Sequence, residues 1–317
     1  MVQNSNNELN FPKFEDISVS TKTFTANTNL KIDIKNVFDK LEVTPYTVIQ
    51  KKRGRKKRTE TINPNQNIVP GSIITVKCEG EIKGVDLKPK KKNNKKKKWF
   101  RNSITVVIIF DKIINFKICR NGTFQMTGCK NHNHAELCIK KIWEEIKNFP
   151  EHLYEFTRPS LNGDNKLEVL FIPSMRNIDF SLGFIVDREK LNKYMTDKAM
   201  NSDDFHCLLE TSFGYTGVNI KIPLTKDIRT MKIRKMSYEK DGSWLYTNTN
   251  YNEYLNLLPS EKDKNNKLND ERYNTFLVFH SGKVIHSGLT FEFMQDSYYF
   301  FLDVMREGFN YIEERLD

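Results

Sequence analysis

The stretch Thr275–Thr290, TFLVFHSGKVIHSGLT, decides the fold of this chain. Its apolar run Phe276–Phe279 is followed by a tight turn at Gly282 and then by a second β-prone run. Two such runs joined at a glycine are typical of a β-hairpin. The patterned segment Phe291–Ile312 comes next, and its spacing predicts a long helix.

The same arrangement occurs earlier in the chain. Residues Phe116–Lys130, FKICRNGTFQMTGCK, again give a strand, a glycine turn and a second strand, and a helical pattern follows. Gly122 and Gly282 are 160 residues apart, and so are Gly128 and Gly288. This spacing indicates that one strand-and-helix unit is written twice.

The beginning of the unit can be sought upstream of each hairpin. Ile17–Leu30, ISVSTKTFTANTNL, and Ile178–Leu191, IDFSLGFIVDREKL, both read as a strand that runs on toward a short helix. Their first and last residues are offset by 161 positions. Two copies are too few for a solenoid, so we expect a pseudo-symmetric pair.

The pattern Phe-x-Ser-Gly-Lys-Val-x-x-Ser-Gly, from Phe279 to Gly288, resembles the end-of-repeat signature of the TATA-box-binding protein family. Arg176-Asn177-Ile178 resembles the Gln-Asn-Ile with which the second repeat of that family begins. The resemblance covers about 17–149 and 177–312, with large insertions in both copies. The Lys- and Asn-rich composition and the insertions suggest a divergent version from a large DNA virus.

The resemblance implies an α+β saddle: a curved antiparallel sheet of two similar halves, with helices on the convex face. It implies a flexible lead at 1–16, a first repeat at 17–150 with basic insertions, a connector at 151–176 and a second repeat at 177–317. The second repeat carries an insertion at about 227–271, whose charged end SEKDKNNKLNDE is expected to be a mobile loop.

In that family the concave face sits in the DNA minor groove and aromatic wedges prise base steps apart. Phe279 stands at the second-repeat wedge position, three residues before the turn glycine. Tyr215 matches the partner wedge, and Phe213 is a competing candidate. Asn177 matches the central amide that contacts base edges. Taken alone, Phe279 would be a core residue of a strand and Asn177 a turn or strand-start residue.

Further groove contacts are implied on the last strand of each hairpin. Ile285 and Ser287 match the β-branched and hydroxyl positions of the second repeat, and Gln125 and Thr127 are their counterparts in the first. The minor groove offers few distinguishing donors and acceptors, so shallow contacts of this kind suit it.

The first repeat departs from the family pattern. Its hairpin wedge position is Cys119, the opposite wedge falls near 70–72 with no aromatic, and the 161-residue offset puts Asp16 at the central amide position. In the second repeat, Asp179 replaces an apolar residue that would face the groove. We therefore expect any kink in the DNA to occur at one end, with Phe279.

The net charge of +11 is confined to two segments. Lys51–Arg58 and Lys88–Lys98 hold 15 of the 51 basic residues, and the remaining 36 stand against 40 acidic ones. Such runs can be solvated loops, a nuclear localisation signal or an electrostatic arm that releases counterions from DNA. Arg53-Gly54-Arg55 also resembles the core of an AT-hook, whose arginines, here Arg53 and Arg55, enter a narrow minor groove.

One constellation has metal-like spacing: Cys129, His132, His134 and Cys138. Zinc takes Cys and His ligands in tetrahedral arrangements. However, Cys129 stands where the repeat needs a small residue, and Cys138 falls on the apolar stripe of the helix. We therefore predict no metal and no cofactor.

No glycine-rich phosphate loop, paired carboxylates or nucleophile with a base can be found, which argues against an enzyme and against a small-molecule substrate. No 18-residue apolar run predicts a membrane span, no signal pattern opens the chain, and five cysteines without a framework suit a reducing compartment. We expect a transcription initiation factor that binds AT-rich duplex DNA and recruits general transcription factors and RNA polymerase, in the nucleus or a cytoplasmic virus factory. The alternative is an interaction module that has lost specific DNA binding.

Overall fold

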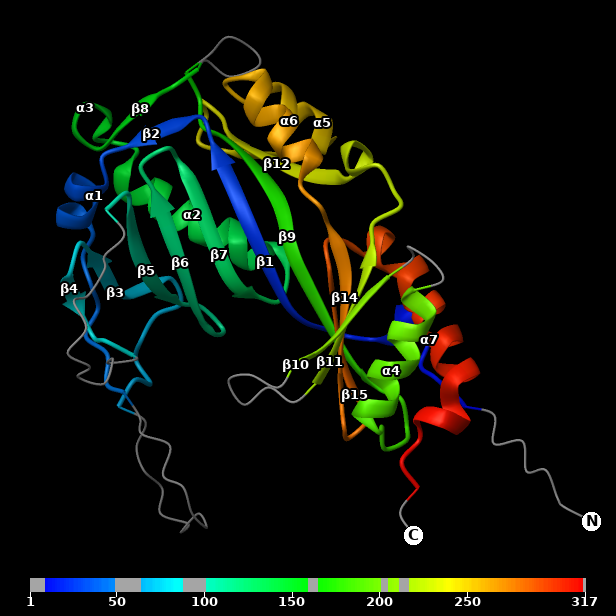
Figure 1. Cartoon of the computed structure of the whole chain (residues 1–317). Coiled ribbons are helices and arrows are strands. Elements are labelled where there is room, and N and C mark those ends of the chain that lie inside the picture. The colour runs from blue at the N-terminus through cyan, green and yellow to red at the C-terminus, as the bar shows by residue number, and fades with distance from the viewer. Residues whose placement is uncertain are drawn as a thin grey trace, which may run out of the picture. The chain divides into compact units, whose positions relative to one another are not determined.

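The computed structural model describes residues 9–48, 64–87, 101–158, 165–200, 205–210 and 217–315. The chain forms two compact units (Figure 1). We call Thr23–Ile172 with Arg234–Asn248 the N-terminal unit, and Met1–Lys22 with Pro173–Ile233 and Thr249–Asp317 the C-terminal unit. No helix among the described residues is long and apolar enough to cross a membrane.

The N-terminal unit is built on a sheet with the strand order β1-β7-β6-β5-β3-β4. The strands from β7 to β4 pair antiparallel. Their bounds are β1 Val19–Thr28, β3 Ser72–Cys78, β4 Glu81–Gly84, β5 Ser103–Ile109, β6 Ile113–Cys119 and β7 Thr123–Cys129. The remaining elements are β2 Leu30–Ile32, which pairs with β8 Tyr154–Phe156, and the helices α1 Ile34–Lys40, α2 His132–Ile146 and α3 Pro150–Leu153.

The core of this unit lies between the sheet and α2. Strand residues alternate between the two faces of a sheet, and Phe116, Phe124 and Met126 are all buried on the same face. The apolar stripe of α2, which includes Ile139 and Ile142, belongs to the same buried cluster. The opposite face of the sheet is therefore the one left for contacts with other molecules.

The C-terminal unit repeats this plan with the strand order β10-β11-β14-β15-β9, all antiparallel. The strands are β9 Glu168–Ser181, β10 His206–Glu210, β11 Gly217–Pro223, β14 Tyr273–Phe279 and β15 Lys283–Gly288. The helices are η1 Phe14–Asp16, α4 Arg188–Ala199, η3 Ile228–Thr230, α5 Tyr251–Asn256, α6 Glu261–Asn269 and α7 Phe291–Ile312. The expected α+β class, with antiparallel sheet and helices on one face of it, is confirmed in each unit.

Helix α7 covers one face of the C-terminal sheet through stacked rings. The centroid of the Phe276 ring on β14 lies 4.2 Å from the ring centroid of Phe301 on α7 and 4.0 Å from that of His286 on β15. The segment before β1 is held on the same helix, because the Tyr298 hydroxyl donates a hydrogen bond to the Pro12 carbonyl at 2.6 Å. These contacts show which face of β14 and β15 belongs to the core.

Hydrogen bonds show how the two copies correspond. The Thr28 amide donates to the Gly122 carbonyl, and the Leu182 amide donates to the Gly282 carbonyl. The hairpin turns are thus offset by 160 residues, whereas the first strands of the two copies, β1 and β9, are offset by 154. The expected offset of 161 for those strands is wrong by seven residues.

The first helices agree with the shorter offset. Asp33 caps α1 by accepting from the amides of Lys35 and Asn36, and Asp187, 154 residues later, caps α4 by accepting from the Lys190 amide. A side-chain acceptor at this position satisfies free amides at a helix start. The short helix expected after Ile17–Leu30 therefore begins only after Asp33, and the residues Leu30–Ile32 form β2.

Both hairpin turns need glycine for the same reason. Gly122 and Gly282 have φ angles of 75° and 72°, a region that other residues rarely adopt. A Cβ atom would lie 2.1 Å from the Leu30 carbonyl oxygen at Gly122 and 2.0 Å from the Phe184 oxygen at Gly282. The turn of each hairpin is therefore packed directly against the backbone that leads to the first helix.

The insertion in the second repeat is structured. It contributes the hairpin strands β12 Lys232–Tyr238 and β13 Trp244–Asn250, of which β12 pairs with the first residues of β9. The expected mobile loop at its end is wrong, because Glu261–Asn269 form α6. The Ser260 hydroxyl accepts from the Asp263 amide, which is the contact of an N-cap.

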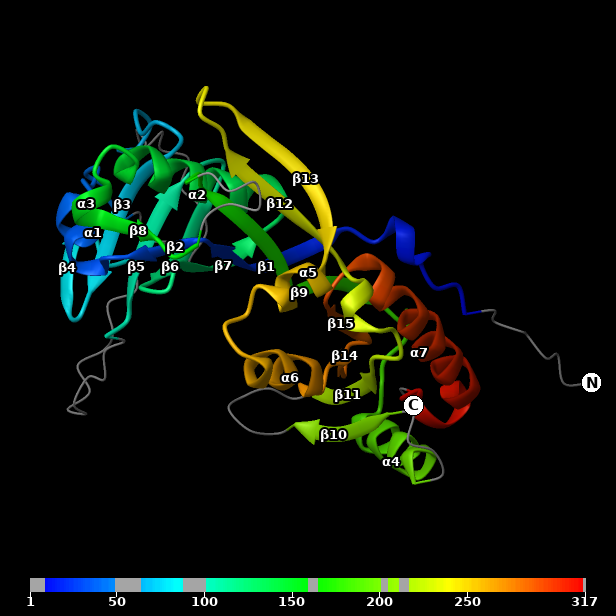
Figure 2. The same cartoon turned by 90° about the horizontal axis from the view of Figure 1, so that it is seen from above.

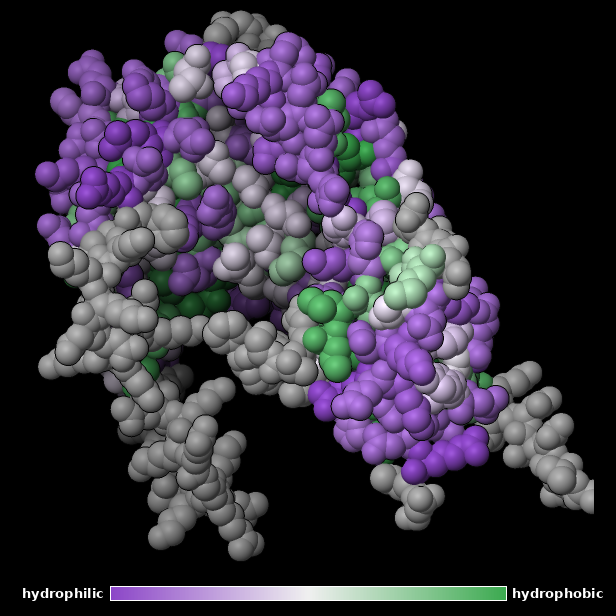
Figure 3. Space-filling model, in the orientation of Figure 1, coloured by the Kyte–Doolittle hydropathy of each residue, from purple (hydrophilic) through white to green (hydrophobic). Residues whose placement is uncertain are grey.

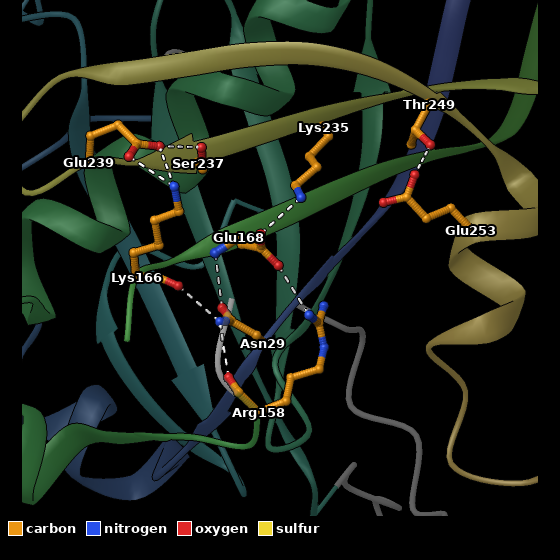
Figure 4. A network of polar contacts seen from close by, with 9 residues as sticks. All are labelled: Asn29, Arg158, Lys166, Glu168, Lys235, Ser237, Glu239, Thr249 and Glu253. Atoms are coloured by element: carbon orange, nitrogen blue, oxygen red, sulfur yellow. Dashed lines mark hydrogen bonds and ion pairs between the residues drawn. The ribbon is translucent and has the colours of Figure 1, made fainter. Parts of the chain in front are cut away.

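A buried polar network ties the β12–β13 hairpin to the N-terminal unit. The Glu168 side chain is 3% exposed and pairs with Arg158 at 3.0 Å and Lys235 at 2.8 Å. The Asn29 side chain accepts from the Glu168 amide at 2.9 Å. Figure 4 shows Arg158 and Lys235 on different sides of the carboxylate. Since a buried charge is costly unless it is paired, these contacts fix where the hairpin docks.

Candidate nucleic-acid interface

Strand β14 divides its side chains between the two faces of the C-terminal sheet. Asn274, Phe276 and Val278 are buried, whereas Thr275, Leu277 and Phe279 are only partly buried. Since alternate residues share a face, the second set points away from α7. We call this side the C-terminal open face. It comprises Thr275, Leu277, Phe279, Ile285, Ser287, Asn177, Asp179, Asn219 and Lys221.

The strand register brings three of the predicted site residues into one region. Ser287 lies directly opposite Asn177 on β9 and opposite Thr275 on β14. Ile285 lies opposite Asp179 and Leu277 in the next row. The open face thus offers a row with hydroxyl and amide groups beside a row in which the apolar Leu277 and Ile285 lie between Asn219 and Asp179.

The Asn177 side-chain oxygen is not committed to a hydrogen bond within the described fold. Its side-chain oxygen is enclosed and has no hydrogen-bond partner among the residues that the structure describes. The Asn177 backbone carbonyl, in contrast, accepts from the Ser20 hydroxyl at 3.2 Å. A buried acceptor without a partner is costly, and the group of this side chain that can donate to a ligand is its amide nitrogen.

Phe279 stands at the end of β14, directly opposite Gly217 on β11. Its ring belongs to the open face and is partly exposed. The predicted partner wedge, Tyr215, and its competitor Phe213 lie outside the described residues, as do Arg53, Arg55 and both basic runs. The structure therefore locates a candidate for one of the two wedge positions of the second repeat.

The N-terminal unit has a corresponding side, which we call the N-terminal open face. On β7, Gln125 and Thr127 are exposed, and they lie opposite Lys117 and Asn115 on β6. The Thr127 hydroxyl donates to the Asn115 carbonyl at 3.4 Å. Figure 3 shows mainly pale and purple side chains over these strands. This face is polar, without the aromatic ring that Phe279 provides in the other unit.

Cys119 occupies the position of Phe279 in the first copy and pairs across the strands with Ser103. Burial raises the pKa of the Cys119 thiol. The side chain is therefore a small neutral group. Cys119 pairs with Ser103 as Phe279 pairs with Gly217, so the counterpart of Tyr215 in the first copy is Arg101, and the expected opposite wedge at 70–72 is wrong. The residues directly before Arg101 lie outside the described part of the chain.

Asp16 does not occupy the central amide position. It lies in η1, which packs beside α7 in the C-terminal unit. The 154-residue offset between Leu182 and Thr28 makes Thr23 the counterpart of Asn177, and Thr25 the counterpart of Asp179. The carboxylate expected at the centre of the first repeat is thus replaced by a hydroxyl. Asp179 remains an exposed carboxylate on the C-terminal open face.

The four residues with metal-like spacing, Cys129, His132, His134 and Cys138, are buried or contact other side chains. Cys129 and Cys138 are fully buried, and burial raises the pKa of Cys129 to about 11. The His134 ring lies 2.8 Å from Asp111, and the His132 ring packs on Phe24 with centroids 4.6 Å apart. In the described part of the chain, no group of three or more such side chains could hold a metal ion.

Several open-face residues were not anticipated from the sequence, among them Leu277, Asn219, Lys221, Asn115 and Lys117. Each alternates with buried neighbours on its strand, which was the available signal. The missing information was the register, since only the pairing of strands brings these residues beside the predicted ones.

No protein-family model matches the chain. It is 28% identical over 222 residues to the uncharacterized protein 335L of Invertebrate iridescent virus 6, covering 67% of this chain and 62% of that protein. It is 31% identical over 154 residues to the TATA-box-binding protein-like protein of Acanthamoeba polyphaga mimivirus, covering 43% and 40%. The chain thus spans less than two thirds of the length of either relative.

Among solved structures, the chain is similar to the TBP of Methanococcus jannaschii, with a TM-score of 0.41 and 15% identity over 93% of this chain and 99% of that one. The similarity to the mimivirus protein confirms the resemblance, drawn from the hairpin motifs, to a divergent TATA-box-binding-like protein, and both relatives are viral.

Proposed function

We propose that this chain is a divergent viral protein of the TATA-box-binding type that binds AT-rich duplex DNA in the minor groove and recruits the transcription machinery. The observation that carries the proposal is the C-terminal open face. It places Asn177, Ser287, Ile285 and Phe279 on one side of a sheet whose other side is filled by α7.

The polar row suits the chemistry of the minor groove. A·T pairs present only acceptors there, the N3 of adenine and the O2 of thymine, and G·C pairs add an amino group. The Ser287 hydroxyl and the Asn177 amide can donate to these acceptors. Leu277 and Ile285 beside them give shallow apolar contact, which an added guanine amino group would disturb. The face is therefore expected to prefer A·T pairs.

Phe279 supplies the wedge. An apolar ring at the end of a strand can enter between two base pairs, and the bend that follows lets more of the sheet contact the groove. In the first repeat, Cys119 cannot do this because its side chain is too small. We therefore infer a kink at one end of the site only.

The N-terminal open face adds contacts without a wedge. Gln125, Thr127, Thr23 and Thr25 offer hydroxyl and amide groups, and Lys117 brings a positive charge. The basic runs, with Arg53 and Arg55, would contribute a salt-dependent attraction to phosphates that does not depend on sequence. The work of the protein would be assembly rather than catalysis, in the nucleus or a virus factory, with general transcription factors and RNA polymerase as partners.

A second candidate is an interaction module that keeps the fold but has lost specific DNA binding. Asp179 favours it, because this exposed carboxylate would face the acceptors and phosphates of DNA. Cys119 in place of a wedge favours it too. In that case any DNA affinity would reside in the basic runs alone.

The test is binding of the full chain to an AT-rich and a GC-rich duplex of equal length, each at low and at high salt. A preference for the AT-rich duplex that survives high salt supports groove binding by the sheet. Equal affinities that collapse together as salt rises would leave only electrostatic binding. That result would overturn the proposal in favour of the interaction module.

A further inference from the structure

Strand β13 is an edge strand. Its neighbour β12 pairs with β9 on one side and with β13 on the other, and β13 pairs with β12 alone among the described strands (Figure 2). The outer row of amide and carbonyl groups on β13 thus has no strand beside it in the described chain. Such a row is a template for another strand.

The sequence of β13, Trp244–Asn250, does not protect this edge. WLYTNTN contains no charged residue, no proline and no glycine over seven residues, and it is rich in β-prone side chains. Other edges are guarded: β4 is four residues long and carries Glu81 and Lys83, and β10 is only five residues long. Short strands and charges are the usual means of preventing edge pairing, so their absence on β13 is distinctive.

The hairpin presents this edge on a rigid support. The Trp244 ring packs on Tyr238 with centroids 4.9 Å apart, and Tyr238 in turn meets Trp143 of α2 at 5.6 Å. The Lys140 ammonium lies 5.3 Å from the centre of the Tyr246 ring. One side of β13 is therefore fixed on α2, while Leu245, which is 51% exposed, and Thr247 project from the other side.

We propose that β13 pairs with β13 of a second copy of this chain, antiparallel and centred on Thr247. A neutral strand can do this because no like charges are placed opposite one another. In this register Thr247 faces its own counterpart, Tyr246 faces Asn248 and Leu245 faces Thr249. Threonine pairs across strands are favourable contacts, and the two-fold symmetry is that of the commonest protein dimers. The pairing does not depend on the proposed DNA binding.

The experiment uses two opposite charges at the centre of the pairing. The wild-type chain, Thr247→Lys and Thr247→Glu are studied by sedimentation velocity over about a hundredfold range of concentration, because mass action governs a dimer. We expect a concentration-dependent dimer for the wild type. For each variant alone, like charges at the centre should raise the dissociation constant about tenfold or more. A one-to-one mixture of the two variants should recover the dimer.

Ile82→Lys on the guarded edge β4 is the matched control, and it should leave the wild-type dimer unchanged. A wild-type chain that stays monomeric overturns the proposal and leaves the edge to a strand from a different protein. So does a dimer that persists in both charged variants, or a mixture that fails to recover it. Circular dichroism of each variant verifies that the exposed substitution has not changed the fold.

Discussion

Phe279 lies directly opposite Gly217 across strands β14 and β11. Since glycine has no side chain, the ring has no side-chain neighbour opposite it on the β11 side. A Cβ atom at Gly217 would lie 2.8 Å from Leu277 Cδ1 and 3.2 Å from the Val278 carbonyl oxygen. Gly217 therefore keeps the open face clear beside the proposed wedge and lets Leu277 occupy its present place.

Substitution of Gly217 should disturb DNA binding through Phe279 and Leu277 on the neighbouring strand. In Gly217→Val, the new side chain displaces Leu277 and crowds Phe279, so we expect affinity for an AT-rich duplex to fall about tenfold, in a fold destabilised by about 1–3 kcal/mol. Gly217→Ala should show a smaller loss of both. Fluorescence anisotropy and urea unfolding measure the two effects, and a valine variant with unchanged affinity would contradict the assigned role of this position.

Removal of the carboxylate on the open face should improve binding. Asp179 is exposed opposite Ile285, where it repels DNA if the groove lies on this face. We expect Asp179→Asn to raise the affinity for AT-rich DNA about threefold at low salt, and less at high salt because the repulsion is screened. Asp303→Asn on α7 removes the same charge from the other side of the sheet. An equal gain in both variants would argue against this location of the DNA.

His286 should make the C-terminal unit sensitive to acid. The imidazole is fully buried, neither nitrogen has a hydrogen-bond partner among the described residues, and burial lowers its pKa from 6.5 to about 3. The folded chain therefore stays neutral here while the unfolded chain takes up a proton below about pH 6.5. Stability is present above that pH and is lost as the pH falls from about 6.5 toward 3.

The variant His286→Phe should remove this contribution. Between about pH 7.5 and pH 5, the wild type should lose about 2 kcal/mol more of its free energy of unfolding than the variant does. The variant should also be more stable at neutral pH, by about 1 kcal/mol, because a buried unpaired polar group is gone. Urea unfolding at both pH values measures this, and parallel losses in the two proteins would show that His286 does not stay neutral in the fold.

The turn of the second hairpin allows a comparison of two glycines. Gly282 and Gly183 both have positive φ angles, 72° and 83°, but a Cβ atom at Gly282 would lie 2.0 Å from the Phe184 oxygen, whereas at Gly183 it would meet nothing within 4 Å. Gly183→Ala should cost only backbone strain, about 1 kcal/mol. We expect Gly282→Ala to cost about 2 kcal/mol more. Equal melting temperatures would show that the turn can move away from Phe184.

The sequence predicted the hairpins and the long helices well. Glycine turns at Gly122 and Gly282, period-two alternation and a period of 3.6 are local signals, and they correctly indicated β6, β7, β14, β15, α2 and α7. The correspondence of the first strands was wrong because Ile17–Leu30 and Ile178–Leu191 match in letters without sharing hydrogen-bond partners. The N-cap residues Asp33 and Asp187 were the better guide, since each must satisfy the same free amides.

The insertion was underestimated for a different reason. Composition alone suggested a loop at 260–271, whereas Ser260 and Asp263 form a capping contact that starts α6. The docking of β12 on β9 involves residues that are distant in sequence, such as the ion pair of Glu168 with Lys235. Of the candidate site, Asn177, Ser287, Ile285 and Phe279 could be predicted from motifs. The residues between them could not, because strand register is a property of the folded sheet.

The most direct test of the central claim is the effect of Phe279→Ala on the ratio of affinities for AT-rich and GC-rich duplexes at high salt. Tyr311→Ala, an exposed aromatic on α7, is the matched control. We predict that the ratio falls toward one in Phe279→Ala and that the control matches the wild type. Donor–acceptor energy transfer across the duplex should show that the single kink in the DNA is lost with Phe279→Ala. An unchanged ratio, or two equal kinks in the wild-type complex, would contradict the account.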